Sequence, residues 1–542
     1  MNSVPDLLDP EPQRRLDARA LREALTFAFA TGGTSESFNK IWERAKFGAS
    51  DFASDCFARE LFLADFVTRC LSFTIGGEKY LPERGHLQRL LAQPPRDLRV
   101  TQFRQQILRE LLAAPERAEE LGRLTLKIRS LVQRLEAPDR GKRYDAIGRR
   151  IDILRCVREL LDELSTAFTG AGPGLERIRT FALEQQALPA YHTLVNLLDH
   201  ESDRATIELR VKVGYDGELR SFQIVRAGEN QENPFYRTRF ARFFTRLTLW
   251  LQGYGFREAE LLGRLANAAF DGVQDCVISL FQLLVDMEFY LASLSLRQLA
   301  KRSGLDMCLP DFSSEAVAQS QIEALFNPFL LFEERPPKSA DIAVGQRALV
   351  VITGPNSGGK TRLLQALALA QLLGQSGAFV PARRAALQVR HGLFVSLSQE
   401  VSSDQREGRL GTELLRIRRM FEQLRFGSLV ILDELCSGTN PSEGEEIFEL
   451  VVSLLAELEP QAFITTHFLQ FASRLEKERP VSRLEFLQVE LDAQENPTYG
   501  FVPGVATTSL AERTAERLGV TREALRELVD RAKRQLPGAS NG

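Results

Sequence analysis

A glycine-rich segment in the C-terminal half of the chain constrains the fold more than any other feature. The apolar run Leu349–Thr353 is typical of a buried strand, and a segment that reads GPNSGGKT, residues 354–361, follows it at once. A helical pattern begins directly afterwards, over residues 362–373. A strand, a G-x-x-x-x-G-K-T loop and a helix in this order predict a phosphate-binding loop (P-loop) in a parallel sheet.

The chemistry of this loop predicts ATP and Mg²⁺ as cofactors. Glycines let backbone N–H groups close around phosphates, and the helix N-terminus adds its positive end. We expect Lys360 to reach the β- and γ-phosphates and the Thr361 hydroxyl to ligate Mg²⁺. The alternative is a flexible turn with no ligand. The residues expected to bind nucleotide are Gly354, Pro355, Asn356, Ser357, Gly358, Gly359, Lys360 and Thr361.

Two later apolar runs also end in chemically active side chains. Residues 428–432 lead into Asp433 and Glu434, and residues 462–466 lead into His467. Asp433 is expected to hold Mg²⁺, and Glu434 to orient and deprotonate the attacking water. His467 is placed to sense the γ-phosphate. A plain helix cap and a structural histidine are the alternatives. With Lys360, these residues predict a nucleotide hydrolase whose site lies at the carboxyl edge of a parallel sheet.

The N-terminal half, up to about residue 312, has a helical pattern. Apolar residues recur at helical spacing over 103–135, with a break at Pro115, over 149–164, and over 259–299. Alternation of apolar and charged residues over 207–213, a turn at 215–218 and a second run at 219–225 predict a β-hairpin between long helices. An ordinary helical bundle remains the alternative to a long lever.

A basic segment follows this hairpin. Residues 233–257 contain five arginines and no acid, and their apolar residues fall on one helical face. Arg237, Arg239, Arg242 and Arg246 are therefore candidate contacts to nucleic-acid phosphates. A helix with a merely solvated basic face is the alternative. The net charge of −3 excludes a globally basic nucleic-acid binder, so a polyanion site must be local.

Composition places the chain among globular proteins of several domains. At roughly 150 residues per domain, 542 residues predict about three or four domains. The chain contains no run of about 18 uncharged apolar residues, so no transmembrane helix is expected. Its acidic, polar N-terminus lacks the basic start and apolar run of a signal peptide. We therefore expect a cytoplasmic protein with no membrane partner.

Residues 349–535 resemble the ATPase domain of the MutS family. Residues 352–361 are similar to its T-G-P-N-x-G-G-K loop, and 377–382 to its G-x-x-V-P-A step. Residues 433–439 are similar to its D-E-x-x-x-G-T segment, and 466–468 to its T-H-[FY] switch. A weaker likeness of residues 80–135 and 211–305 to the family's helical core, lever and clamp extends over most of the chain.

The resemblance implies a multidomain fold and a composite site. It predicts a helical region at 1–90, then a helical core and lever at 91–312 with a small β-hairpin, clamp-like insert near 203–257. An α/β P-loop ATPase domain of the ABC/MutS type would follow at 313–536, and a polar tail at 537–542. It also implies a homodimer in which Gly411 and Thr412 of one subunit close the ATP site of the other.

Three departures from the family pattern modify these expectations. Residues 1–90 hold no F-x-E motif and are too short for the mismatch-reading domain and its connector. The usual S-T-F of the trans-acting signature is replaced by Gly411, Thr412 and Glu413. Residues 441–444 resemble the second bacterial MutS type, associated with branched DNA and stalled ribosomes, yet no Smr nuclease domain follows. Nuclease activity is therefore not expected.

Three functions remain open at this point. The first is an ATP-dependent, DNA-binding ATPase that acts as a dimeric clamp in DNA repair or recombination, on double-stranded, branched or damaged DNA. The second is an ATPase whose arms grip a ribosome or another protein, with no role for DNA. The third is a sensor that binds nucleotide and barely hydrolyses it.

Overall fold

The computed structural model describes residues 4–33, 35–138, 143–201, 206–213, 219–228, 255–312, 319–397, 409–436, 440–507 and 522–534. It divides into two compact units, to which we refer as the helical unit and the sheet unit. The helical unit comprises Met1–Ser50, Ala64–Leu299 and Gln375–Phe379. The sheet unit comprises Asp51–Leu63, Ala300–Gly374 and Val380–Gly542. The expected ranges 1–90 and 91–312 thus fall largely within one unit.

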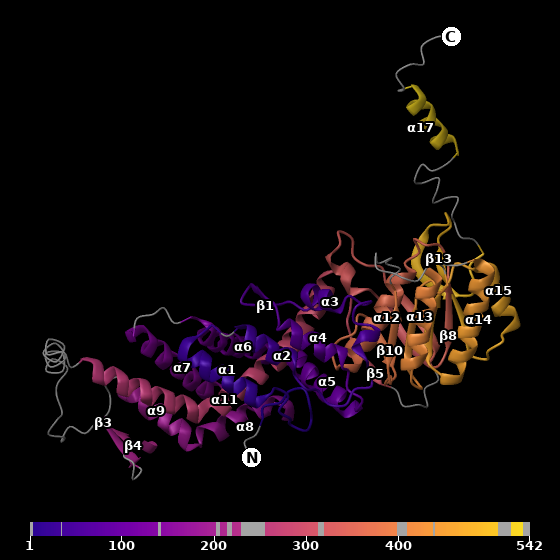
Figure 1. Cartoon of the computed structure of the whole chain (residues 1–542). Coiled ribbons are helices and arrows are strands. Elements are labelled where there is room, and N and C mark those ends of the chain that lie inside the picture. Colours follow the sequence, from indigo (N-terminus) through magenta and orange to yellow (C-terminus); the bar gives the residue numbers. More distant parts are fainter. Residues whose placement is uncertain are drawn as a thin grey trace. The chain divides into compact units, whose positions relative to one another are not determined.

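Helices lying alongside one another build the helical unit (Figure 1). They are α1 (Ala18–Thr31), α2 (Ser35–Glu43), α3 (Leu63–Cys70), α4 (Arg84–Ala92), α5 (Leu98–Ala113), α6 (Pro115–Glu136), α7 (Arg143–Leu164), α8 (Pro173–Gln186), α9 (Pro189–Glu201) and α11 (Gly255–Arg302). A two-stranded sheet joins β1 (Phe73–Ile75) to β2 (Glu78–Tyr80). Pro115 separates α5 from α6, because proline fits the first turn of a helix but interrupts its interior.

The long helix α11 forms the core of this unit. Every residue over 276–293 is buried, so this part of the helix is surrounded by the protein on all sides. Phe281 near its middle packs against Phe38 and Trp42 of α2. Within the described residues, Gly263–Arg302 is long and apolar enough to cross a membrane, but 94% of its most apolar window is buried in the protein. That burial is typical of a core helix.

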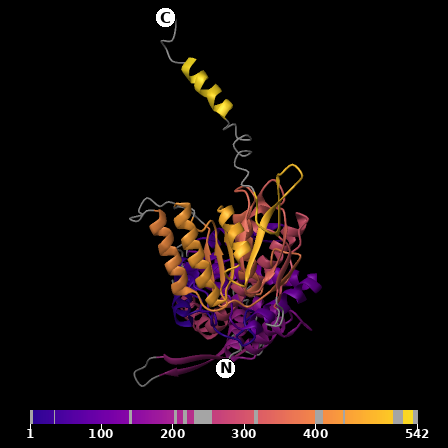
Figure 2. The same ribbon diagram turned by 90° about the vertical axis from the view of Figure 1, so that its right-hand side faces the viewer.

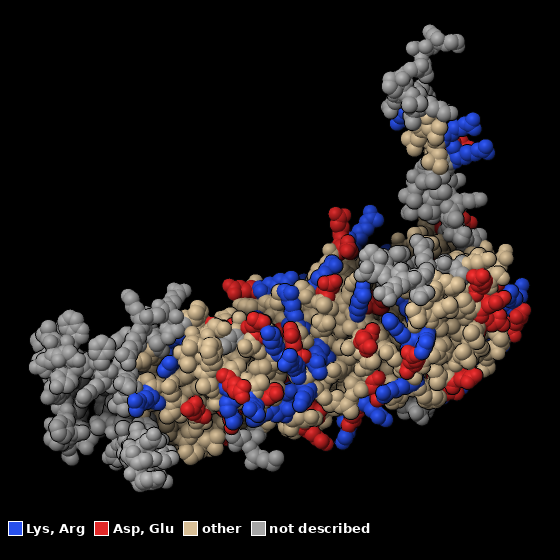
Figure 3. Space-filling model, viewed as in Figure 1, with Lys and Arg blue, Asp and Glu red and all other residues tan. Residues whose placement is uncertain are grey.

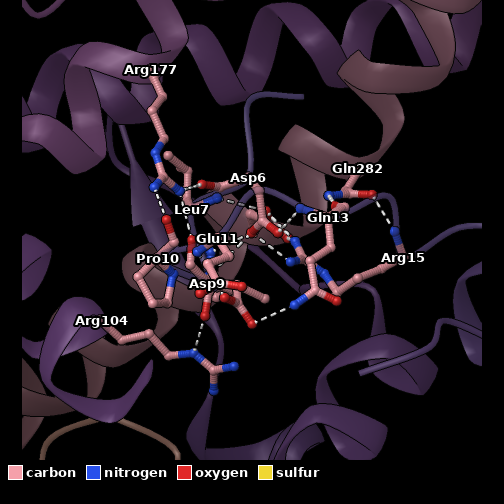
Figure 4. Close-up of polar contacts among 12 residues, drawn as sticks. Asp6, Leu7, Asp9, Pro10, Glu11, Gln13, Arg15, Arg104, Arg177 and Gln282 are labelled. Atoms are coloured by element: carbon pink, nitrogen blue, oxygen red, sulfur yellow. Dashed lines mark hydrogen bonds and ion pairs between the residues drawn. The ribbon is translucent and has the colours of Figure 1, made fainter. Parts of the chain in front are cut away.

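The N-terminal segment before α1 is built into the same core through charged side chains (Figure 4). Arg15 pairs with Asp6 and with Asp286 of α11, and all three side chains are at most 4% exposed. Arg104 of α5 donates to the Leu8 carbonyl, and Arg177 of α8 donates to the carbonyls of Asp6 and Asp9. These contacts join residues distant in sequence, which stabilises one arrangement of the helices.

A hairpin follows α9, with β3 (Thr206–Val213) antiparallel to β4 (Leu219–Gly228). Its register pairs Thr206 with Gly228 and Val211 with Phe222. The turn at 214–218 lies outside the described residues. So do residues 229–254, and with them the candidate nucleic-acid contacts Arg237, Arg239, Arg242 and Arg246.

The sheet unit is centred on a six-stranded sheet of order β10-β11-β12-β8-β13-β14. Its strands are β8 (Leu349–Thr353), β10 (Leu393–Ser396), β11 (Leu429–Leu432), β12 (Gln461–Thr465), β13 (Leu484–Leu491) and β14 (Pro497–Pro503). All neighbours are parallel except β13 and β14. Helices flank the sheet (Figure 2): α12 (Lys360–Gln375), α13 (Arg409–Gln423), α14 (Pro441–Leu458) and α15 (Leu469–Glu478). The expected parallel sheet is confirmed.

A second sheet of four strands, which the sequence patterns did not predict, also belongs to this unit. Its order is β5 (Asp311–Phe312), β9 (Arg384–Leu387), β6 (Gln319–Leu325) and β7 (Ala340–Gly345). Leu367 of α12, Ile342 of β7 and Phe463 of β12 line one small internal cavity. Helix α12 therefore packs between the two sheets, which explains why its apolar residues occupy all of its faces.

Each unit contains a short segment from the other half of the sequence. Helix α12 ends at Gln375, and Gln375–Phe379 belongs to the helical unit, where Thr101 donates to the Gln375 carbonyl and Arg104 to the Ser376 carbonyl. Conversely, Asp51–Leu63 belongs to the sheet unit, where Glu60 accepts a hydrogen bond from the backbone of Leu397, directly after β10. The two units are therefore interleaved in sequence.

Candidate nucleotide-binding site

The three predicted motifs follow neighbouring parallel strands. Strands β11, β12 and β8 are adjacent, and they end at Leu432, Thr465 and Thr353. Because the carboxyl ends of parallel strands meet at one edge, the P-loop, Asp433-Glu434 and His467 gather there. Backbone bonds align the ends: Asp433 N–H donates to the Ser396 carbonyl, and Thr466 N–H to the Ile352 carbonyl. The edge is where α/β sheets bind ligands.

The P-loop glycines are required by the close approach of neighbouring atoms. Gly354 and Gly359 have φ values of +135° and +84°, which favour glycine. A Cβ on Gly354 would lie 2.6 Å from the Val489 side chain, and one on Gly358 would lie 2.7 Å from it. Asn356 and Ser357 at the tip are exposed. The loop is thus a tight backbone cradle ahead of α12, consistent with phosphate binding.

Lys360 lies inside this cradle and is only 3% exposed. Its Nζ donates to the carbonyl oxygens of Gly354, at 2.8 Å, and Pro355, at 3.1 Å. Burial lowers the pKa of the ammonium, while the carboxylates of Glu434 and Asp433 oppose that shift. A buried ammonium held mainly by carbonyl oxygens is well placed to gain from an anionic phosphate.

Thr361 and Asp433 fit a magnesium ion. The Thr361 hydroxyl donates to Asp433 Oδ2 at 2.6 Å, so the two expected ligands already converge. Hydroxyl and carboxylate oxygens are the hard ligands that Mg²⁺ takes together with phosphate oxygens. Thr361 is exposed and Asp433 half-buried, which leaves the pair accessible to substrate.

Glu434 stands in a strained backbone conformation. Its φ is +50°, in the left-handed region that non-glycine residues rarely adopt. Its N–H donates to the Thr465 hydroxyl at 2.7 Å. His467, from the end of β12, is exposed and its ring lies 4.2 Å from that of Phe468. Strain of this kind often accompanies a functional site.

Gly411 and Thr412 lie in the first turn of α13 and are half-buried. The next residue, Glu413, accepts a hydrogen bond from the backbone N–H of Cys436, two residues beyond Glu434. Helix α13 is therefore tied to the loop that carries Glu434 within one chain. Residues 437–439, which complete the D-E-x-x-x-G-T likeness, lie outside the described residues.

A cavity of about 360 Å³ lies beside the P-loop, and the sequence patterns did not predict it. Its apolar lining includes Phe326, Leu330, Leu363 and Phe501, and Gly359, Arg362 and Tyr499 also line it. A Cβ on Gly359 would lie 3.1 Å from the Tyr499 ring, so this ring covers the loop. Tyr499 itself has a φ of +65°. Apart from Gly359, these residues belong to no predicted motif, and they come from α12, β14 and the segment after β6, which are separated in the sequence.

Thr465 is a second residue of the site that the sequence patterns did not identify. Its hydroxyl accepts from the Glu434 N–H and donates to Asp433 Oδ1 at 2.6 Å, so it contacts both acidic residues. The signal available in the sequence was the doubled threonine Thr465-Thr466 at the end of an apolar strand. A polar pair at such a position lies at the carboxyl edge of the sheet, beside the two acids.

Known proteins resemble the chain in this same region. Residues 350–536 match the family MutS domain V. Endonuclease MutS2 of Thermus thermophilus is 28% identical over 446 residues, which cover 79% of this chain and 55% of that protein. Endonuclease MutS2 of Thermomicrobium roseum is 33% identical over 215 residues, covering 38% of this chain and 26% of that protein.

A third relative, endonuclease MutS2 of Streptococcus uberis, is 34% identical over 183 residues, covering 33% of this chain and 23% of that protein. The chain thus spans about half the length, or less, of these curated relatives. Residues 350–536 therefore resemble MutS domain V, and both this match and the relatives agree with the strand-end geometry described above.

Proposed function

We propose that the sheet unit binds ATP with Mg²⁺ and hydrolyses it, and that the chain acts as a dimeric clamp on branched or damaged DNA in repair or recombination. The observation that carries the proposal is the contact between Thr361 and Asp433 beside a glycine cradle and the neighbouring Glu434. The match to MutS domain V, together with relatives that are called endonucleases, supports a role on DNA.

In this proposal the P-loop backbone and Lys360 hold the phosphates. The buried ammonium exchanges its carbonyl partners for phosphate oxygens, which stabilises negative charge as it shifts during transfer. Thr361 and Asp433 hold Mg²⁺, which neutralises charge between the β- and γ-phosphates when bound. Glu434 accepts a proton from the attacking water, and His467 contacts the γ-phosphate.

We place the base of the nucleotide in the cavity beside the P-loop. Its volume lies within the usual range of ligand pockets, and its lining is largely apolar with polar groups at the rim. The Tyr499 ring, which lies against Gly359, offers a flat surface at the point where the phosphates leave the cavity. Arg362, in the first turn of α12, also lines the cavity and adds positive charge there.

The dimer in this proposal completes the site through Gly411 and Thr412 of a second copy. Their position in the first described turn of α13 supports a role near an anionic phosphate, which the N-terminal end of a helix favours. Glu413 replaces the apolar residue of the usual signature and binds the Cys436 backbone instead. A change at the signature would therefore move the loop that carries Glu434.

Fluorescence anisotropy on labelled DNA tests the clamp. Homoduplex, mismatched, branched and single-stranded DNA are compared at several salt concentrations, with ADP and with a non-hydrolysable ATP analogue. We expect binding that depends on nucleotide, prefers branched DNA and weakens steeply with salt, since phosphate contacts release counterions. The variant with Arg237, Arg239, Arg242 and Arg246 all changed to Gln should lose most of that salt dependence. Absence of binding to every DNA would contradict the clamp.

The second candidate is an ATPase that grips a ribosome or another protein without a role for DNA. The charge distribution favours it: on the face shown in Figure 3, basic and acidic side chains are interspersed and no field of one sign forms. The net charge of −3 agrees with this. Affinity purification with Glu434→Gln protein in ATP distinguishes the two, because ribosomal material retained after nuclease treatment would support this candidate, and DNA would support the clamp.

A further inference from the structure

Thr465 occupies a central position at the proposed site, although no motif includes it as a functional residue. It is the last residue of β12, and its side chain is fully buried. In the parallel register, Ile464 pairs with Leu432 on one side, and Thr465 pairs with Ile352 on the other. The backbone therefore places Thr465 between the strand that ends at Asp433 and the strand that enters the P-loop.

The Thr465 hydroxyl contacts both acidic residues. Its Oγ1 donates to Asp433 Oδ1 at 2.6 Å and accepts from the Glu434 N–H at 2.7 Å. The other carboxylate oxygen, Asp433 Oδ2, accepts from Thr361. A threonine hydroxyl has a single proton to donate. That proton is committed to Asp433, so the hydroxyl orients the carboxylate and leaves Oδ2 directed toward Thr361.

The same hydroxyl compensates for backbone strain at Glu434. A left-handed conformation is unfavourable for a residue with a Cβ and persists where surrounding contacts determine it. The bond from the Glu434 N–H to a fully buried acceptor is such a contact. Removing the acceptor leaves this N–H without its partner, which favours a different backbone conformation and moves the Glu434 carboxylate.

We propose that Thr465 is a positioning residue, which sets Asp433 for the metal and Glu434 for the attacking water at once. The inference rests on the proposed ATP hydrolysis, because both acidic residues take their roles from it. Thr465 itself contacts neither substrate nor metal in this account. Its β-branched side chain has few rotamers, which makes it a stiffer support than serine.

The test compares Thr465→Val, which keeps the shape and removes the hydroxyl, with Thr465→Ser, which keeps the hydroxyl. Thr125→Val is the matched control, because Thr125 is also fully buried and its hydroxyl donates to the Leu121 carbonyl within α6 of the helical unit. For each protein we measure binding of fluorescent ADP in EDTA and in Mg²⁺, steady-state ATP turnover, and hydrogen exchange of the peptide that contains Glu434.

We expect Thr465→Val to bind ADP in EDTA as the wild type does but to lose most of the gain in affinity that Mg²⁺ brings. Turnover should fall by about 10- to 100-fold, the range for losing a hydrogen bond to a charged group, with KM changing less than kcat. The Glu434 peptide should exchange faster. The turnover of Thr465→Ser should stay within about threefold of the wild type. Thr125→Val should behave as the wild type does.

Each outcome decides the inference. A Thr465→Val protein with wild-type magnesium response, turnover and exchange would overturn it. Loss of ADP binding in EDTA would also overturn it, because the residue would then support the P-loop instead. If Thr465→Val fails to fold, Thr465→Ser decides, since restored exchange protection and turnover require the hydroxyl. A wild-type chain that neither responds to Mg²⁺ nor hydrolyses ATP would refute the proposed function itself.

Discussion

Two clusters of polar side chains, one in each unit, differ in how their carboxylates are compensated. The ionic cluster of the helical unit consists of Asp6, Arg15 and Asp286, in which one guanidinium joins two acids (Figure 4 shows Asp6 and Arg15). The hydroxyl cluster of the sheet unit consists of Thr361, Asp433 and Thr465, in which two hydroxyls donate to one acid. Among the described residues, no arginine or lysine forms an ion pair with Asp433 within 4.0 Å.

The difference separates a structural from a chemical role. In the ionic cluster one buried guanidinium contacts both buried acids, and these contacts hold the N-terminal segment against α11. In the hydroxyl cluster the Asp433 carboxylate is held by two hydroxyl donors, forms no ion pair with an arginine or lysine of the described residues, and is half-exposed. A carboxylate in that state favours a cation, and the nearby P-loop favours an anion. The comparison predicts which substitutions affect stability and which affect nucleotide binding.

Arg15→Met should give the largest effect, because it leaves Asp6 and Asp286 buried without a cation. Breaking one side of a buried ion pair destabilises a protein by about 3–5 kcal/mol. Arg22→Met is the control, since the Arg22–Asp275 pair is about half-exposed and should contribute no more than about 1 kcal/mol. Denaturant unfolding followed by tryptophan fluorescence measures both, because Trp42 lies in the helical unit. Equal losses of unfolding free energy in the two variants would contradict the structural role assigned to the ionic cluster.

Lys360→Ala should weaken ATP binding by about 100-fold, the loss expected for charge-assisted hydrogen bonds to phosphate, with little effect on unfolding. Binding of a fluorescent ATP analogue measures the change. Lys477→Ala, in the exposed last turn of α15, serves as the control for general loss of positive charge. If both variants bind alike, Lys360 does not contact the phosphates.

Tyr499→Ala should weaken nucleotide binding by about tenfold, since stacking of a base on an aromatic ring contributes roughly 1–3 kcal/mol. Tyr499→Phe keeps the ring and should bind as the wild type does. Titration with fluorescent ADP and with pyrophosphate separates the two parts of the ligand: only ADP binding should change. A matching loss for pyrophosphate would place Tyr499 at the phosphates rather than at the base.

Glu83 is a carboxyl group of the helical unit that tests the comparison further. The nearby cation, Arg129, pairs with Glu288 rather than with Glu83. Burial and then the neighbouring Glu288 raise the pKa of Glu83 to about 7, from an ordinary value of 4.5. The folded state holds this proton more tightly than the unfolded state. The contribution to stability is therefore complete below pH 4.5 and is lost as the pH rises through 7.

Glu83→Gln should remove this pH dependence. Between pH 5 and pH 8 the wild type should lose about 2 kcal/mol more than the variant in its free energy of unfolding. Denaturant titrations of both proteins at the two pH values measure the difference. Parallel profiles would mean that Glu83 ionises in the folded protein as it does in the unfolded chain.

Local patterns in the sequence predicted the parts of this molecule that depend on neighbouring residues. The strand before Gly354, the helix after Lys360 and the acids after β11 were readable because each motif follows an apolar run. The contacts of Thr465, Tyr499 and Arg15 were not, since each joins strands or segments that are far apart in the chain. The four-stranded sheet was not predicted for the same reason, because β5 pairs with β9 although the whole P-loop segment lies between them in the sequence.

The most direct test of the central claim is steady-state phosphate release by the purified chain with ATP and Mg²⁺, compared with Glu434→Gln. The account predicts Mg²⁺-dependent turnover in the wild type and a loss of about 100-fold or more in the variant, as expected for removal of a general base, with ATP still bound. Equal turnover of the two proteins, or turnover that persists in EDTA, would contradict the assignment of Glu434 and of the magnesium site at Thr361 and Asp433.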